Sequence, residues 1–251
     1  TKEGRLTVIT INRPEVMNAL HPPANIELSE AFDNFVSDPD QWVAIITGAG
    51  DKAFCAGNDL KYQASGGDMK GQPSSGFGGI TSRFDNTKPI IPAVNGVAMG
   101  GGFEIALACD LIVAAENAVF SLPEPRVGLA ALGGGIHRLP REIGIKKAMG
   151  MLLTGRRVSA QEGKDLGFVN EVARKNSVLD TAKDWAGLIL ECAPLSVRAS
   201  KEAAMLGMNA SGIEDAIKSR YKQVQLMKKS SDFVEGPRAF SEKRPPNWKG
   251  L

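Results

Sequence analysis

Two glutamates beside glycine-rich or proline-rich turns are the residues of this chain best suited to acid–base chemistry. Glu104 follows the glycine run Gly100 to Gly102, where an apolar strand pattern changes to a helix pattern. Glu124 comes twenty residues later, between Pro123 and Pro125. Two carboxyl groups that meet in a dry site have their pKa values pushed apart and can serve as base and acid on one water molecule. The spacing alone does not establish that they meet.

The glycine run could bring backbone N–H groups close to a ligand. Glycine permits a close approach of the backbone, and a helix that begins there offers unpaired N–H groups to an oxyanion. Taken alone, a simple strand-to-helix turn is the better interpretation, because the run lacks the G-x-G-x-x-G and Gly-Lys-Ser patterns of phosphate sites. Glu104 by itself could merely complement the helix dipole, and Glu124 by itself could be a surface acid.

A second glycine-containing turn, Ala53 to Leu60 (AFCAGNDL), follows another strand pattern. It could present one more backbone N–H group or be a turn without function. Cys55 within it has no histidine or cluster of bases nearby in the sequence. The surroundings therefore favour a packed thiol over a nucleophile.

The remaining composition excludes several classes of site. The three cysteines are scattered, without a C-x-x-C pair, which is typical of a reducing compartment. With only His21 and His137 present, neither a multi-histidine metal site nor a Ser-His-Asp triad is expected. We therefore predict no bound metal ion and no cofactor.

Charge and hydropathy point away from nucleic acid and membrane partners. The 251 residues carry a formal net charge of +2, which creates no general field for polyanions. No run of about 18 apolar residues could span a bilayer. We expect a cytoplasmic protein, although the chain begins at Thr1 almost inside a strand pattern, so an organelle location stays open.

The pattern of elements is α/β. Short β-branched runs that end in turn formers alternate with segments of helical spacing. The expected strands are Leu6 to Asn12, Val43 to Gly48, Ile90 to Val97 and Leu111 to Ala115, and the expected helices are Pro22 to Val36 and Phe103 to Cys109.

Later segments predict a loop and a helical C-terminal third. Residues 65–79 are so rich in Gly and Ser that a surface loop, and hence a lid, is expected. Ser159 and Glu162 form a capping box that should open a helix ending near Leu166. Further amphipathic helices are expected to begin near Val178, Pro194 and Ile213.

Four motifs, in this order and at these spacings, resemble the enoyl-CoA hydratase/isomerase, or crotonase, family. They are NRPEVMNAL (12–20), FCAGNDL (54–60), NGVAMGGGFEIALACD (95–110) and LPEPRVGL (122–129). The resemblance covers essentially the whole chain, and the ending EGPRAFSEKRPPNWKG is similar to that of carnitinyl-CoA dehydratases. It implies an α/β spiral of repeated strand-strand-helix units over residues 1–192, followed by a C-terminal helical region, 193–251, that supports trimers or hexamers.

The resemblance also implies roles for individual residues. Glu104 and Glu124 match the catalytic glutamates, and the N–H groups of Ala56 and Gly101 match the oxyanion hole. One carboxylate would activate water for attack at the β-carbon of an enoyl-CoA while the other exchanges a proton at the α-carbon, and the reverse reaction eliminates water. The residues implied to bind the acyl-CoA substrate are Arg13, Val16, Asn18, Cys55, Asn58, Asp59, Leu60, Gly100, Leu132, Phe240 and Lys243, the last two reaching a neighbouring subunit.

The chain departs from the family pattern beside the second glutamate. Pro125 replaces a common aliphatic residue, and Ala131-Leu132 replaces a Pro-Gly or Pro-Asp pair. This implies a reshaped acyl pocket and puts carnitine specificity in doubt.

Other functions remain open on the same scaffold. An oxyanion hole also serves a double-bond isomerase, a C–C lyase or a thioester hydrolase, because fold does not determine function. A non-catalytic RNA-binding relative is a weaker alternative, since aromatic residues make up only 6% and the basic residues form isolated pairs such as Lys146-Lys147.

Overall fold

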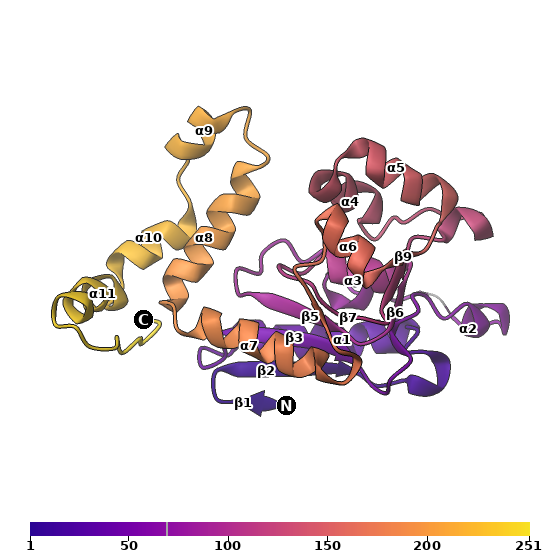
Figure 1. Cartoon of the computed structure of the whole chain (residues 1–251), viewed down its shortest axis with the longest axis horizontal. Coiled ribbons are helices and arrows are strands. Elements are labelled where there is room, and N and C mark those ends of the chain that lie inside the picture. Colours follow the sequence, from indigo (N-terminus) through magenta and orange to yellow (C-terminus); the bar gives the residue numbers. More distant parts are fainter. Residues whose placement is uncertain (69) are drawn as a thin grey trace.

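The computed structural model describes residues 1–68 and 70–251 and has an α/β architecture built on two sheets (Figure 1). The α/β prediction is confirmed. The predicted loop 65–79 includes Met69, which lies outside the described residues. The last residues of this loop form a short 3-10 helix, η2 (Phe77–Gly79).

The larger sheet has six strands in the order β1-β2-β3-β5-β7-β10, and only the β1–β2 pair is antiparallel. Its strands are β1 (Lys2–Glu3), β2 (Leu6–Ile11), β3 (Val43–Gly48), β5 (Ile90–Val94), β7 (Val113–Ala115) and β10 (Glu171–Ala173). Residues of β3 alternate between two hydrophobic clusters, since Val43 and Ile45 pack on one face while Ala44 and Ile46 pack on the other. The sheet is thus buried on both sides, as parallel sheets require.

A smaller sheet carries the strands nearest to the glycine-rich turns. Its order is β4-β6-β8-β9, formed by β4 (Ala53–Cys55), β6 (Val97–Met99), β8 (Val119–Ser121) and β9 (Val158–Ser159). Consecutive strands therefore divide between the two sheets: β3, β5 and β7 enter the larger one, and β4, β6 and β8 follow them into the smaller one. This repetition gives the core its spiral path.

The predicted single strand from Ile90 to Val97 is wrong, because the chain turns at Asn95 and Gly96 and changes sheet. The Asn95 side chain accepts a hydrogen bond from the Gly48 N–H group and donates to the Gly48 and Gly50 carbonyl groups. Gly96 lies so close to Lys52 that an added Cβ would be 2.4 Å from its carbonyl oxygen. A buried asparagine thus replaces the strand ladder at this corner.

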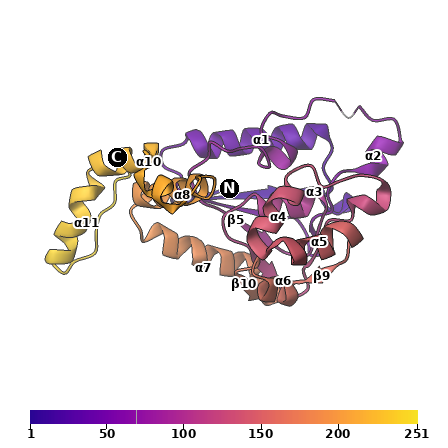
Figure 2. The same cartoon turned by 90° about the horizontal axis from the view of Figure 1, so that it is seen from above.

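Helices cover both faces of the larger sheet (Figure 2). Helix α1 (Pro22–Ser37) lies over one face with Phe32 and Phe35 buried, and α7 (Val178–Leu190) packs on β3, β5 and β7 from the other. The remaining helices of this part are α2 (Leu60–Ala64), α3 (Gly101–Leu107), α4 (Gly135–Ile143), α5 (Ile145–Thr154) and α6 (Ala160–Leu166), with 3-10 turns η1 (Pro14–Val16), η3 (Glu124–Val127) and η4 (Lys175–Ser177).

Several predicted boundaries shift by a few residues for local reasons. Helix α3 begins at Gly101 instead of Phe103, because the glycines themselves form its first turn. Strand β7 begins at Val113, after the Ile112 N–H group has bonded to the side chain of Asn170. The predicted N-cap at Ser159 is confirmed, since its hydroxyl accepts a hydrogen bond from the Glu162 N–H group at 3.1 Å. The Glu162 carboxylate pairs with Arg156 at 2.7 Å, so the reciprocal bond of a full capping box is replaced by an ion pair.

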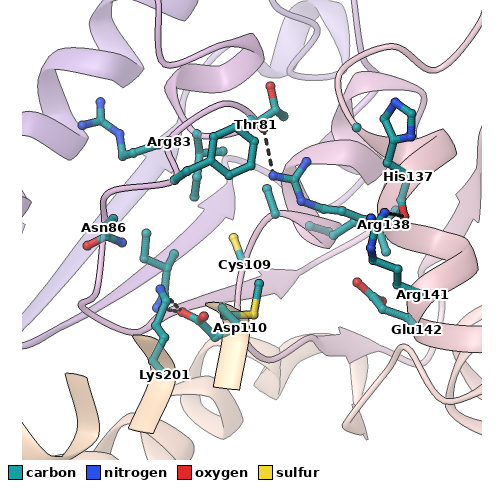
Figure 3. Close-up of a pocket in the computed structure, with 18 of the residues that line it drawn as sticks. Thr81, Arg83, Asn86, Cys109, Asp110, His137, Arg138, Arg141, Glu142 and Lys201 are labelled. Carbon is teal, nitrogen blue, oxygen red and sulfur yellow. Dashed lines mark hydrogen bonds and ion pairs between the residues drawn. The ribbon is translucent and has the colours of Figure 1, made fainter. Parts of the chain in front are cut away.

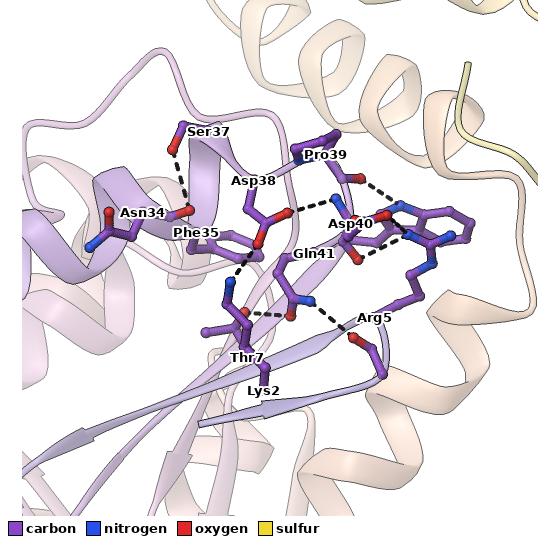
Figure 4. A network of polar contacts seen from close by, with 12 residues as sticks. Lys2, Arg5, Thr7, Asn34, Phe35, Ser37, Asp38, Pro39, Asp40 and Gln41 are labelled. Carbon is purple, nitrogen blue, oxygen red and sulfur yellow. Dashed lines mark hydrogen bonds and ion pairs between the residues drawn. The ribbon is translucent and has the colours of Figure 1, made fainter.

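The amino-terminal edge of the sheet is held by polar side chains (Figure 4). Lys2 pairs with Asp38 at 2.5 Å, and Arg5 pairs with Asp40. The buried Gln41 amide accepts from the Thr7 hydroxyl at 2.7 Å and donates to the Gly4 carbonyl at 2.9 Å. These contacts fasten β1 and β2 to the loop between α1 and β3.

The C-terminal helices extend away from the two sheets (Figure 1). They are α8 (Pro194–Gly207), α9 (Ile213–Lys218), α10 (Lys222–Lys229) and α11 (Asp232–Ser241), and they contact mainly one another. The final residues return along them, because the Trp248 indole donates to the Glu191 carbonyl and the buried Asp232 carboxylate accepts from the Lys249 and Gly250 N–H groups. The division into regions 1–192 and 193–251 stays a prediction.

Candidate active site

The turn after β4 leaves one backbone amide pointing toward the glycine run. Leu20 forms a parallel bridge with Asn58, in which its N–H group donates to the Gly57 carbonyl and its carbonyl accepts from Asp59. In this geometry the N–H group of Asn58 points to the side opposite Leu20. Within residues 1–68 and 70–251, the Asn58 N–H group has no hydrogen-bond acceptor.

This arrangement corrects the expected role of Ala56. Its N–H group already donates to the Met17 carbonyl at 3.0 Å. It is therefore not free to bind a substrate oxygen, and the sequence pattern alone could not show this because the acceptor comes from another loop. The neighbouring donor, Asn58, was expected only as a substrate-contacting residue.

The turn after β4 and the start of α3 lie against each other. Gly57 has a φ of +92°, and an added Cβ there would lie 3.2 Å from the Gly101 nitrogen. Gly101 is the first residue of α3, so its N–H group has no acceptor inside the helix. The ring of Phe77, from η2, rests on Gly101, since an added Cβ at Gly101 would lie 2.4 Å from that ring.

Glu104 is buried in the first turn of α3 with 5% of its surface exposed. Burial raises the pKa of this carboxyl group to about 7. Weaker influences partly oppose burial: the Gly135 N–H group donates to Oε1 at 2.9 Å, and the Gly133 N–H group and the Arg138 cation also favour the charged form. The negative charge of Glu124 acts in the same direction as burial, so the two carboxyl groups are electrostatically coupled.

Glu124 begins the 3-10 turn η3 and lies directly against the glycine run. An added Cβ at Gly100 would lie 2.9 Å from Oε1 of Glu124. Its Oε2 atom is buried and has no hydrogen-bond partner among the described residues. Burial raises the pKa of this carboxyl group as well. The fold thus brings both glutamates to the start of α3, beside the two turns that carry the Asn58 and Gly101 amides.

Two of the expected substrate-binding side chains are occupied by the protein itself. Asn18 has 0% of its surface exposed, and its amide accepts from the Arg13 N–H group and donates to the Ala49 and Ala53 carbonyls. Cys55 is equally buried, and burial raises the pKa of its thiol to about 12. Neither side chain is available to a ligand, so a contact with the substrate could come only from their backbone atoms, and the expected binding role stays a prediction.

Arg13 and Asp59 form a pair at the edge of the site. The guanidinium contacts the Asp59 carboxylate at 3.1 Å, and the same carboxylate caps α2 by accepting from the Tyr62 N–H group. Asp59 is buried, whereas Arg13 is half-buried. The pair joins the loop before α1 to the turn after β4, and 23% of the Arg13 side chain stays exposed.

The other expected contacts divide by position. Val16 ends η1 and Leu60 begins α2, whereas Leu132 is 77% exposed beside the Gly133 turn. Phe240 and Lys243 lie on and after α11, at the end of the molecule remote from α3 (Figure 1). Within this single chain they do not approach the glutamates.

A cavity of about 820 Å³ lies behind the site, between α4, α8 and the segment that follows η2 (Figure 3). Arg138 and Glu142 of α4 and Lys201 of α8 line it. Arg138 and the Gly133–Gly135 turn are parts of the Glu104 environment that the sequence interpretation missed. The cue available in the sequence was LGGG, a second glycine run that follows the glutamates.

The described part of the chain contains neither a candidate metal site nor a helix that could span a membrane. No group of three or more His, Cys, Asp or Glu side chains there could hold a metal ion. None of the helices described is both long and apolar enough to cross a bilayer.

Comparison with known proteins assigns the family. The family model "Enoyl-CoA hydratase/isomerase" matches residues 1–251. Carnitinyl-CoA dehydratase from Salmonella enteritidis PT4 is 43% identical over 257 residues, covering 100% of this chain and 97% of the relative, and the protein of the same name from Citrobacter koseri is 42% identical over 256 residues with the same coverage.

Solved structures agree with this assignment. An enoyl-CoA hydratase from Mycobacterium tuberculosis H37Rv superposes with a TM-score of 0.92 at 38% identity, covering 100% of this chain and 98% of the other. A carnitinyl-CoA hydratase from Mycobacterium avium superposes with a TM-score of 0.79 at 40% identity, covering 100% and 97%. The expected crotonase spiral is thereby confirmed, and the chain belongs to the enoyl-CoA hydratase/isomerase family.

Proposed function

We propose that this protein is an enoyl-CoA hydratase that also runs in reverse as a 3-hydroxyacyl-CoA dehydratase. The observation that carries the proposal is the position of Glu104 and Glu124, which flank the start of α3 beside two backbone amides. Family membership supports an acyl-CoA substrate, and two carboxyl groups of raised pKa support the addition and removal of water.

The thioester oxygen is proposed to bind between the N–H groups of Asn58 and Gly101. An enolate-like transition state concentrates negative charge on this oxygen, and preorganised amide donors stabilise that charge. The contact between Gly57 and Gly101 supports the pairing, because it brings the two turns together. Asn58 thus replaces Ala56, whose amide is engaged by Met17.

The two glutamates are proposed to share one proton during the reaction. Glu124 lies against Gly100, next to the Gly101 amide, so it is placed to exchange a proton at the α-carbon beside the thioester. Glu104 is then the base for the water that attacks the β-carbon. In hydration, Glu104 takes a proton from water as the C–O bond forms, and Glu124 delivers its proton to the α-carbon. Return of the proton from Glu104 to Glu124 through solvent then restores the starting state, and dehydration reverses each transfer.

The substrate contacts are proposed from the rim of the site. Arg13, Val16 and Leu60 border the expected path of coenzyme A, and Leu132 borders the acyl end. Two relatives are named carnitinyl-CoA dehydratase, which makes carnitinyl-CoA a candidate substrate. No cofactor beyond the coenzyme A of the substrate is proposed.

Assembly and location are part of the same proposal. The exposed Phe240 and Lys243 would reach the site of a neighbouring subunit in a trimer or hexamer, which explains why they stand far from the glutamates of their own chain. A cytoplasmic location is proposed from the bacterial relatives.

The test is hydration of crotonyl-CoA, followed as loss of the enoyl-thioester absorbance, together with dehydration of carnitinyl-CoA. Glu104→Gln and Glu124→Gln are each expected to lower kcat by about 100-fold or more, the usual scale of acid–base catalysis. Glu30→Gln, an exposed residue of α1, is the matched control. Unchanged absorbance with both substrates would favour the isomerase, lyase or hydrolase alternatives, and product analysis would then distinguish these.

A further inference from the structure

The carboxylate of Glu104 is enclosed by a turn made of glycines. The Gly135 N–H group donates to Oε1, and an added Cβ at Gly133 would lie 2.5 Å from Oε2. Between them, Gly134 adopts a φ of +112°, which favours glycine. Backbone alone therefore contacts the carboxylate on this side, and the position of the turn determines how well Glu104 is held.

Arg138 fastens this turn from behind. It lies on the first turns of α4, and its Nη1 atom donates to the Gly133 carbonyl at 3.3 Å. The Nη1 end of the guanidinium also lies against Gly134, where an added Cβ would be 2.0 Å from Nη1. A side chain at Gly134 would displace the guanidinium, so glycine here serves both the backbone angle and the close packing of Arg138.

The same guanidinium reaches a second segment. Nη2 donates to the Thr81 carbonyl at 2.9 Å, and the Phe84 ring lies 5.7 Å from the guanidinium carbon (Figure 3). Thr81 follows η2, whose Phe77 ring rests on Gly101. Arg138 thus links the turn around Glu104 to the segment that also contacts the proposed oxyanion donor.

Few charged groups act on the Arg138 guanidinium. The acidic groups that act on it are Glu104, Glu142 of its own helix and the Cys109 thiol, and the groups that act on Glu104 are Glu124 and Arg138. Among the residues described, Arg138 forms no ion pair with a carboxylate, and it donates to the backbone carbonyls of Gly133 and Thr81. Its cation is therefore free to favour the ionised form of Glu104.

We propose that Arg138 is a positioning residue for the reaction, which holds the Gly133–Gly135 turn against the Glu104 carboxylate and stabilises its charge. The expected effect of Arg138 on the reaction rate rests on the proposed function. Its expected effect on the charge of Glu104 does not depend on any substrate. Arg138 does not contact the reacting atoms and acts through Glu104.

The experiment compares Arg138→Met, Arg138→Lys and the control Arg141→Met in the full-length protein. Arg141 is exposed, lies three residues along the same helix and donates to the His137 carbonyl of that helix. With crotonyl-CoA, Arg138→Met is expected to lower kcat about tenfold while changing KM less. Its pH profile should move upward by about one pH unit, because an opposite charge near a carboxyl group is lost. Arg138→Lys keeps the positive charge, so its pH profile should lie close to that of the wild type, and Arg141→Met should match the wild type.

A direct readout separates this inference from the proposed function. The titration of Glu104 is followed by NMR on protein labelled with ¹³C at the glutamate carboxyl groups, with Glu104→Gln identifying the signal. An upward shift of the Glu104 midpoint in Arg138→Met supports the inference even if the wild type does not hydrate crotonyl-CoA. An unchanged midpoint overturns it, whatever the effect on kcat. If Arg138→Met does not fold, the same comparison is made with Arg138→Gln, and the same two outcomes decide.

Discussion

The N–H group of Gly135 donates a 2.9 Å hydrogen bond to Oε1 of Glu104, although the two residues lie 31 positions apart in the chain. This bond joins the start of α4 to the first turn of α3. Burial raises the pKa of this carboxyl group, whereas the hydrogen bonds from backbone N–H groups lower it by stabilising the charged form. A group balanced in this way can gain and lose a proton near neutral pH.

The first prediction concerns the pH dependence of activity. If Glu104 and Glu124 work with one shared proton, kcat/KM for hydration should be bell-shaped, falling at low pH when both are protonated and at high pH when both are ionised. One midpoint is expected near 7, the pKa of Glu104. Dehydration should follow the same curve, because the overall reaction releases no proton. A profile that falls on only one side of its optimum would contradict the shared-proton mechanism.

The second prediction concerns stability. Folding raises the pKa of Glu104 from 4.5 to about 7, because burial disfavours the ionised form. The native state therefore loses stability relative to the unfolded state as the pH rises from 4.5 through 7. The full shift corresponds to about 3 kcal/mol. Glu104→Gln should therefore raise the melting temperature more at pH 8.5 than at pH 5. Equal increases at both values would show that Glu104 does not titrate abnormally.

A third prediction tests the contact between Gly100 and Glu124. Gly100 has a φ of 53°, and an added Cβ would lie 2.9 Å from Oε1 of Glu124. Gly100→Ala should cost about 1 to 3 kcal/mol in strain. It should also lower kcat by about tenfold, because the carboxyl group is pushed away from the substrate.

Gly4→Ala is the matched control for this strain. Gly4 has a φ of +60° and no heavy atom within 4 Å of an added Cβ. We expect a loss of stability without a loss of kcat, measured by thermal unfolding and crotonyl-CoA hydration. If the two variants changed kcat equally, displacement of Glu124 would not be the cause.

The fourth prediction separates a structural asparagine from a substrate contact. Asn18→Ala leaves the Arg13 N–H group and the Ala49 and Ala53 carbonyls without their partner, which should lower the free energy of unfolding by about 3 kcal/mol. The exposed Asn34→Ala on α1 should change it by less than about 0.5 kcal/mol. Denaturant titration measures both. A stable Asn18→Ala protein with a raised KM would restore the direct substrate role.

Local sequence determined much of this protein. The β-branched runs are buried strands, Ser159 and Glu162 cap α6, and the glycine run opens a helix that carries Glu104. These features depend on backbone preference and on neighbours a few residues away, which a pattern expresses directly. The four motifs together also sufficed for the family and for both candidate glutamates.

Only the tertiary structure decided which groups are free. The Ala56 N–H group donates to the Met17 carbonyl, whereas the bridge between Asn58 and Leu20 directs the Asn58 N–H group to the opposite side. The Asn18 side chain forms hydrogen bonds with three backbone groups. The turn at Gly133–Gly135 and its link to Arg138 arise likewise from segments far apart in the chain. The direction of an amide depends on which strand or loop lies beside it, and local sequence does not encode that neighbour.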